Sequence, residues 1–175
     1  MPRSAVDKRD RARPPSIEVQ AEPRPGWPAG RMLIASPLAL QAVMATVPAG
    51  RVLRVGDLRA ALARAWGADF TCPLTTGIFW RIVAEAADED RAAGRACDAP
   101  WWRVVRDDGA LLDKLPGGVE AQARRLDEEG VVVLRLGKTP RVTEVEHFAW
   151  EPPLLGKAAG RKPPAKSAKG QPGRR

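Results

Sequence analysis

The sequence predicts a small α+β domain flanked by two disordered tails. Helical and strand-like patterns alternate in the middle of the 175-residue chain, a length that suits one domain with tails. Both ends are rich in proline and charge and offer little apolar surface to bury. Two of the expected helices are joined by a short loop and a strand pair follows later, an order that favours a winged helix-turn-helix domain. We therefore expect the domain over residues 32–150, with tails at 1–31 and 151–175.

Local signals place the elements of this domain in order. Ser36 can cap a helix whose first turn holds Pro37, and Asp57 can cap a second helix that stops at Gly67. A Pro-Gly-Gly turn at 116–118 opens the last helix. The expected elements are a helix from Ser36 to Pro48, an extended piece at 52–55, helices at 58–66 and 76–90, an extended piece at 101–105, a helix at 119–129, and hairpin strands at 131–136 and 141–148.

The basic charge of the chain lies in its tails. Of the net charge of +8, residues 1–31 carry +3 and residues 155–175 carry +7, whereas residues 32–154 carry −2. A polybasic tail attracts a polyanion such as DNA, RNA or an anionic membrane by releasing counterions. A merely solubilising tail is the alternative, but motifs within the domain favour nucleic acid.

Cysteine and histidine content excludes several classes of protein. Two cysteines, Cys72 and Cys97, make no disulfide framework, and with the single histidine, His147, they supply no convincing zinc site. The sequence has no secretory signal and no apolar stretch long enough to cross a bilayer. We expect a cytoplasmic monomer with reduced thiols, no cofactor, no metal and no membrane partner.

A set of ordered motifs resembles a known family. These are Val-Pro-Ala-Gly-Arg-Val at 47–52, Pro-Trp-Trp-Arg-Val-Val at 100–105, Pro-Gly-Gly at 116–118, and Glu129 followed by Gly130. In order and spacing they resemble the alkylguanine-DNA alkyltransferase family, whose corresponding motifs are Val-Pro-x-Gly-x-Val, Pro-Cys-His-Arg-Val-Val, Gly-Gly and Glu-Gly. The resemblance covers about half of the chain, from Val47 to Val132, and is weakest over 66–98.

The resemblance implies DNA binding without the family reaction. In the family, the cysteine of Pro-Cys-His-Arg takes an alkyl group from O6 of a guanine rotated out of the duplex, and the histidine links that cysteine to the glutamate. Here these two positions are Trp101 and Trp102, and only Glu129 remains. The alkyltransferase-like branch also lacks the cysteine; it binds the extruded alkylguanine and recruits other repair proteins. We therefore expect duplex DNA, alkylated or not, and other DNA-repair proteins as partners.

The resemblance also assigns a lesion pocket, comprising Trp101, Trp102, Arg103, Pro116, Gly117, Gly118 and Glu129. Two interpretations of the tryptophans stay open: they contact an extruded base, or they plug a disused pocket. Arg103 is expected to brace nearby carbonyls or carboxylates.

The expected DNA contacts are Thr75, Thr76, Gly77 and Arg81, at the start of the 76–90 helix. Threonine hydroxyls there can donate to phosphate, although Thr76 can equally be a helix cap. Arg81 is either the residue that fills the gap left by a rotated base or a solvent-facing side chain. The family's base-rotating tyrosine falls at Val55 and is absent.

Two other functions remain open. The protein could be a general winged-helix binding module that has lost lesion recognition. It could also be an alkyltransferase with a displaced acceptor, for which Cys72 or Cys97 would be the nucleophile.

Overall fold

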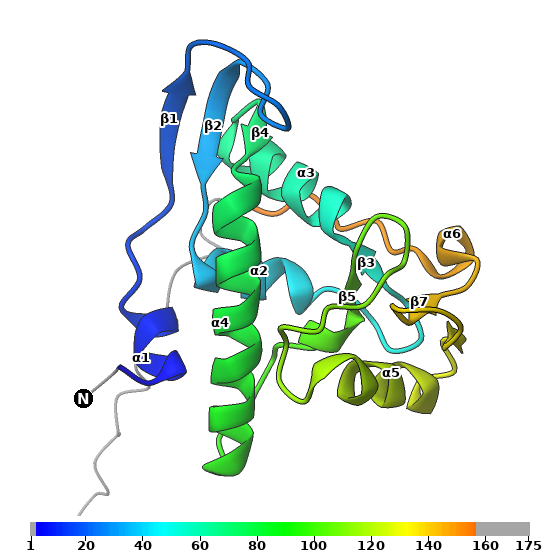
Figure 1. The fold of residues 1–175 in the computed structure, drawn as a ribbon. Helices are drawn as coiled ribbons and strands as arrows, with labels where there is room; N and C mark the ends of the chain where they lie inside the picture. The colour runs from blue at the N-terminus through cyan, green and yellow to red at the C-terminus, as the bar shows by residue number, and fades with distance from the viewer. Residues whose placement is uncertain (1–2, 157–175) are drawn as a thin grey trace, which may run out of the picture.

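The structure, a computed structural model, describes residues 3–156 as a mixed α+β fold (Figure 1). The helices are α1 (Ala5–Asp10), α2 (Pro37–Met44), α3 (Val55–Trp66), α4 (Pro73–Ala92), the 3₁₀ turn η1 (Trp101–Arg103), α5 (Gly118–Glu128) and α6 (Val145–Phe148). The strands are β1 (Ser16–Gln20), β2 (Gly30–Ile34), β3 (Leu53–Arg54), β4 (Phe70–Thr71), β5 (Val104–Val105), β6 (Val133–Leu134) and β7 (Arg141–Val142). Among residues 3–156, no helix is both long and apolar enough to span a bilayer.

The long helix α4 lies at the centre of the larger of two apolar cores. In Figure 1 it runs down the middle of the molecule, with α1 beside its lower half and α2 crossing it. Its buried face, which includes Trp80 and Val83, packs with Leu40 of α2, Leu62 of α3 and Trp101 of η1. A three-stranded sheet in the order β1-β2-β4 lies at the upper end of α4, with β1 antiparallel and β4 parallel to β2.

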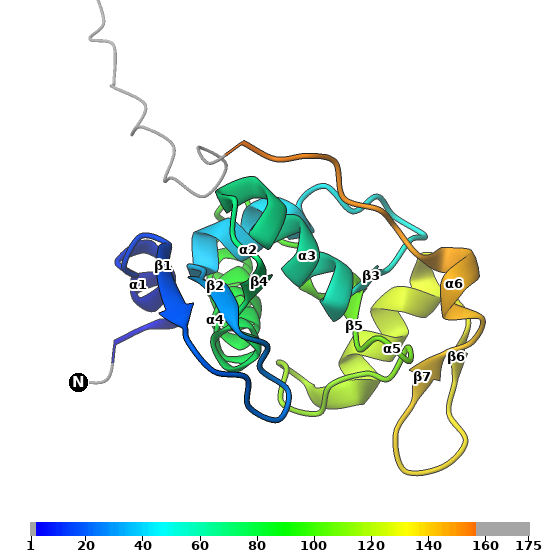
Figure 2. The same cartoon turned by 90° about the horizontal axis from the view of Figure 1, so that it is seen from above.

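A second core forms under α5, and Figure 2 shows α5, β6, β7 and α6 on the side of the molecule away from α1 and β1. It contains Leu126 of α5, Val105 of β5, and Val133 and Val142 of the β6–β7 pair. The parallel pairing of β3 with β5 links the two cores. The coarse prediction of a small α+β domain is therefore right, and the order of its main helices is as expected.

The expectation of a disordered segment at 1–31 is wrong where the structure describes it. Residues 5–10 form α1, residues 16–20 form β1, and β2 begins at Gly30. Composition favoured disorder because the local sequence is charged and proline-rich. The order comes instead from partners far along the chain: α1 packs on α4, and β1 pairs with β2 along its whole length.

Several element boundaries also differ from the prediction. α3 starts at Val55 and α4 at Pro73, whose fixed backbone angle suits a first helical turn. The second hairpin strand ends at Val142, because Glu144 has a φ of +47° and the chain then turns into α6. Residues 151–156 contain no helix or strand, and the rest of the expected C-terminal tail lies outside the described residues.

Candidate nucleic-acid interface and pocket

The first turns of α4 expose apolar side chains on the surface of the domain. Leu74 and Ile78 lie four residues apart on one face of the helix and are 63% and 50% exposed. Gly77 lies between them and is also exposed. Isolated apolar residues are common on surfaces, but this set lies along a concave site and so needs a physical account.

A pocket of about 610 Å³ opens between α4 and the loop that precedes α5. We call it the α4 pocket. Its size falls within the range of about 300–1,000 Å³ that is usual for small-ligand sites. Its apolar wall comes from Leu74, Gly77 and Ile78 of α4 and from Leu112 and Leu115 of the loop.

The rim of the α4 pocket is cationic. Lys8 of α1, Arg81 of α4 and Lys114 of the loop line it, together with one acid, Glu85. Arg81 and Glu85 form an ion pair at 3.1 Å one helical turn apart, and the Arg81 side chain is still 55% exposed. Neither Lys8 nor Lys114 has an ion-pair partner among the residues that the structure describes. The rim is therefore suited to an anion, whereas the wall is suited to an apolar group.

The conformation and packing of α4 do not explain why position 77 is a glycine. It lies inside α4 with ordinary helical geometry, where glycine costs about 1 kcal/mol relative to alanine. A Cβ atom built on Gly77 would meet nothing within 4 Å. Neither backbone strain nor packing requires glycine here, and Gly77 contributes only backbone atoms to the pocket wall.

The two threonines expected to contact DNA are engaged with the protein. The Thr76 hydroxyl donates to the carbonyl of Cys72 at 2.8 Å, and the residue is only 1% exposed. The assignment of Thr76 as a DNA contact is therefore wrong in this conformation; it stabilises the first turn of α4. Thr75 is half-buried and makes a longer bond of 3.4 Å to the same carbonyl.

Trp101 is a core residue and does not line the α4 pocket. It is fully buried, and its backbone carbonyl accepts a hydrogen bond from Nε1 of Trp80 at 3.3 Å. Its own Nε1 has no hydrogen-bond partner in the described part of the chain. The guanidinium carbon of Arg125 lies 5.4 Å from the centre of its ring. Of the two interpretations left open for Trp101, the structure supports the plug.

Glu129 is held in a clamp with Trp102 and Arg103. Arg103 donates to both carboxylate oxygens through Nε and Nη2, at 2.8–3.1 Å, and through Nη1 to the carbonyl of Val47. These contacts are with a carboxylate and a carbonyl, the two kinds of group expected for Arg103. Nε1 of Trp102 donates to Glu129 at 3.0 Å, and the amide of Gly50 donates at 3.3 Å.

The clamp keeps Glu129 ionised. Burial alone would raise the pKa of Glu129, but the hydrogen bonds from Arg103 and Trp102 outweigh burial and lower it. The same contacts join the 47–50 segment, η1 and the end of α5, which are three of the motifs that carried the resemblance. Glu129 therefore serves the fold.

The Pro-Gly-Gly turn directs the chain from the pocket loop into α5. Gly117 has a φ of +74°, and a Cβ atom there would lie 2.5 Å from the Cβ of Ala121. Glycine is thus required by both conformation and space. Pro116, Gly117 and Gly118 follow this loop directly and do not line the α4 pocket, whereas Leu112 and Leu115 of the loop supply part of its wall.

The two cysteines lie apart from the α4 pocket. Cys72 is 2% exposed beneath the start of α4. Cys97 is half-buried and lines a separate surface pocket of about 440 Å³ with Trp102 and Arg103.

The structure brings Gly77 and Arg81 together in the α4 pocket, which Trp101, Trp102 and Glu129 do not line. Sequence reasoning missed Lys8, Leu74, Ile78 and Lys114. The helical spacing of Leu74, Ile78 and Arg81 is a signal that could have identified the α4 face. No local signal marks Lys8, which reaches the site only because α1 packs on α4.

Comparisons with known proteins find a similarity among solved structures. No family model matches the sequence, and no curated protein matches it. Among solved structures, the chain is similar to the crystal structure of S. pombe Atl1 in complex with damaged DNA containing O6-carboxymethylguanine. The two chains are 22% identical with a TM-score of 0.46, and the match covers 66% of this chain and 93% of that one.

Proposed function

We propose that this protein binds duplex DNA through α4 and receives an O6-alkylated guanine, rotated out of the duplex, in the α4 pocket. In this proposal α3 and α4 act as a helix-turn-helix, and the β6–β7 hairpin acts as a wing. The protein acts in DNA repair by binding the lesion, without accepting the alkyl group. The observation that carries the proposal is the α4 pocket, with its apolar wall, cationic rim and unfilled position at Gly77.

The chemistry of the pocket fits the two parts of an extruded nucleotide. A base rotated out of the duplex loses its stacking contacts, so apolar contact with the pocket wall stabilises it there. The added alkyl group enlarges the apolar surface that is buried. The phosphates on either side of the base remain at the surface, where Lys8, Arg81 and Lys114 can meet them. Leu74 and Ile78 would then lose their contact with water only when DNA is bound.

The lack of alkyl transfer in the proposal follows from the residues at the family's acceptor position. Indole is neither a nucleophile nor a base at neutral pH, and Trp101 is buried in the core. The carboxylate that would complete a thiolate relay is bound by Arg103 and Trp102.

The second candidate is a DNA-binding module without lesion recognition. It is favoured by Val55, which packs against the larger core at the start of α3, where the resembling family has its base-rotating tyrosine. In that case the α4 face would bind every duplex alike.

Binding of the full chain to two labelled duplexes that differ by one O6-methylguanine tests the proposal, by fluorescence anisotropy at one moderate salt concentration. Tighter binding to the modified duplex supports lesion recognition. Equal affinity for both duplexes supports the second candidate. A lack of binding to either duplex overturns DNA binding altogether.

A further inference from the structure

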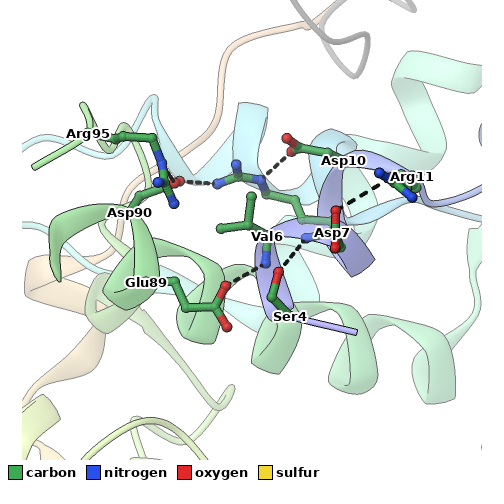
Figure 3. Close-up of polar contacts among 9 residues, drawn as sticks. Ser4, Val6, Asp7, Asp10, Arg11, Glu89, Asp90 and Arg95 are labelled. Carbon is green, nitrogen blue, oxygen red and sulfur yellow. Dashed lines mark hydrogen bonds and ion pairs between the residues drawn. The ribbon is translucent and has the colours of Figure 1, made fainter. Parts of the chain in front are cut away.

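The carboxylate of Glu89, near the C-terminal end of α4, binds the first turn of α1 (Figure 3). The two oxygens of Glu89 accept hydrogen bonds from the backbone amides of Ala5 and Val6, at 2.8 and 3.0 Å. Ser4 caps the same turn by accepting from the amide of Asp7 at 3.1 Å. Amides at a helix start have no partner within the helix, and Glu89 satisfies two of them although it lies 84 residues from Ala5 and 83 from Val6.

A second anchor follows directly on both helices. Arg9 of α1 donates to Asp90 of α4 at 2.6 Å. Arg95 donates to the other oxygen of Asp90 at 2.7 Å (Figure 3). Arg9 is 9% exposed and Asp90 is 4% exposed. A guanidinium buried to this degree needs its anion, so the pair fixes how α1 is rotated on α4.

The two anchors determine where Lys8 lies. Lys8 sits between anchored residues on a helix of six residues, so its backbone has little freedom to move. Its side chain is exposed and lines the α4 pocket beside Arg81 and Lys114. The buried Asp90 and the half-buried Glu89 thus hold Lys8 at the rim of the pocket, where it has no ion-pair partner among residues 3–156.

We propose that α1 is part of the DNA-binding surface, and that Glu89 and Asp90 position Lys8 to contact a backbone phosphate of the bound duplex. This inference rests on the proposed function, and it adds an N-terminal element to a site otherwise formed by α4 and the pocket loop. Lys8 is the contact residue, whereas Glu89 and Asp90 act through it.

A matched pair of variants tests the contact. Lys8→Ala and Arg11→Ala remove the same charge from the same region, but Arg11 is exposed, pairs with Asp7 and does not line the pocket. Affinity of the full chain for an unmodified duplex is measured over a series of salt concentrations. Loss of one phosphate contact reduces the slope of log K against log [salt] by about 0.9. We expect this reduction for Lys8→Ala and not for Arg11→Ala, and we expect Lys8→Arg to retain the wild-type slope.

The positioning role is tested by combining Lys8→Ala with Glu89→Ala. If Glu89 acts by placing Lys8, the Lys8→Ala change has a smaller effect on the salt slope once Glu89 is gone. An equal effect in both backgrounds overturns positioning. If the wild-type chain binds DNA but Lys8→Ala and Arg11→Ala give equal slopes of log K against log [salt], this inference alone is wrong. If the wild-type chain binds no duplex, the proposed function is wrong as well.

Discussion

The Nε1 atom of Trp102 lies 3.0 Å from a carboxylate oxygen of Glu129 and donates a hydrogen bond to it. An indole N–H can donate but cannot accept, so it cannot pass a proton as a histidine at this position could. Arg103 occupies the same carboxylate from another side at 2.8 Å. The glutamate that the resembling family uses in a thiolate relay is, in this chain, part of a structural clamp.

Removing the Glu129 carboxylate is expected to destabilise the fold. Glu129→Ala leaves the Arg103 guanidinium, which is 16% exposed, without its anion, and such a loss costs about 3–5 kcal/mol. Urea unfolding at pH 7 measures the change. Glu128→Ala, at the exposed neighbouring position, is the control and should change stability by no more than about 0.5 kcal/mol. Equal stabilities for the two variants would show that the clamp does not support the fold.

Restoring the family cysteine is not expected to restore alkyl transfer. Trp101→Cys places a thiol in the core, where burial disfavours the thiolate, and Trp102 supplies no base. The variant also leaves a cavity and should lose about 3–5 kcal/mol of stability. Mass spectrometry after incubation with a duplex containing O6-methylguanine should find no methyl group on the protein. A methylated Cys at position 101 would contradict the assignment of Trp101 to a sealed core.

Stability is expected to fall in acid. Backbone hydrogen bonds from Val6 and Ala5 lower the pKa of Glu89; burial would raise the pKa of Asp90, but its bonds to Arg9 and Arg95 lower it. Since these carboxyls bind protons more readily when unfolded, their contribution is complete above their ordinary pKa of about 4. It is lost as the pH falls through the lowered folded-state values.

Unfolding free energies measured from pH 7 to pH 3 check this dependence. Glu89→Gln removes one of the responsible groups and should show a shallower fall than the wild type. Identical pH profiles for the two chains would mean that Glu89 is not linked to folding through its charge.

The basic C-terminal segment is expected to add affinity that is independent of sequence and lesion. Residues 157–175 carry seven basic and no acidic side chains. Charge reversal there should weaken binding to modified and unmodified duplexes by the same factor and flatten the salt dependence. Unchanged affinity at physiological salt would show that this segment does not contribute to DNA binding.

Local signals in the sequence predicted the elements that depend on near neighbours. Ser36 does cap α2, accepting from the amide of Ala39 at 3.2 Å, and the glycines at 117 and 118 do open α5. In each of these cases the signal and the group that it satisfies lie within a few residues. The position of these elements could therefore be inferred from the chain alone.

The missed features depend on contacts between distant segments. Nothing within the first 31 residues shows that Glu89 will hold Ala5, or that Asp90 will bury Arg9. Burial of Trp101 likewise depends on how α4 packs, and Trp-Trp in a motif gives no indication of which ring faces the core. Motif spacing therefore predicted a lesion pocket at Trp101, Trp102 and Glu129, and none of these three residues lines the α4 pocket.

Two substitutions at Gly77 test whether the α4 pocket receives part of the DNA. Gly77→Ala adds a Cβ that meets nothing within 4 Å and should stabilise α4 by about 1 kcal/mol while leaving the pocket open. Gly77→Phe should fold at least as well as the wild type, since phenylalanine is a better helix former than glycine, and should place a large side chain in the pocket. We expect the alanine variant to keep the wild-type preference for an O6-methylguanine duplex in the anisotropy assay, and the phenylalanine variant to lose it. If both variants keep the preference unchanged, the lesion is not bound in the α4 pocket and the proposed function is wrong.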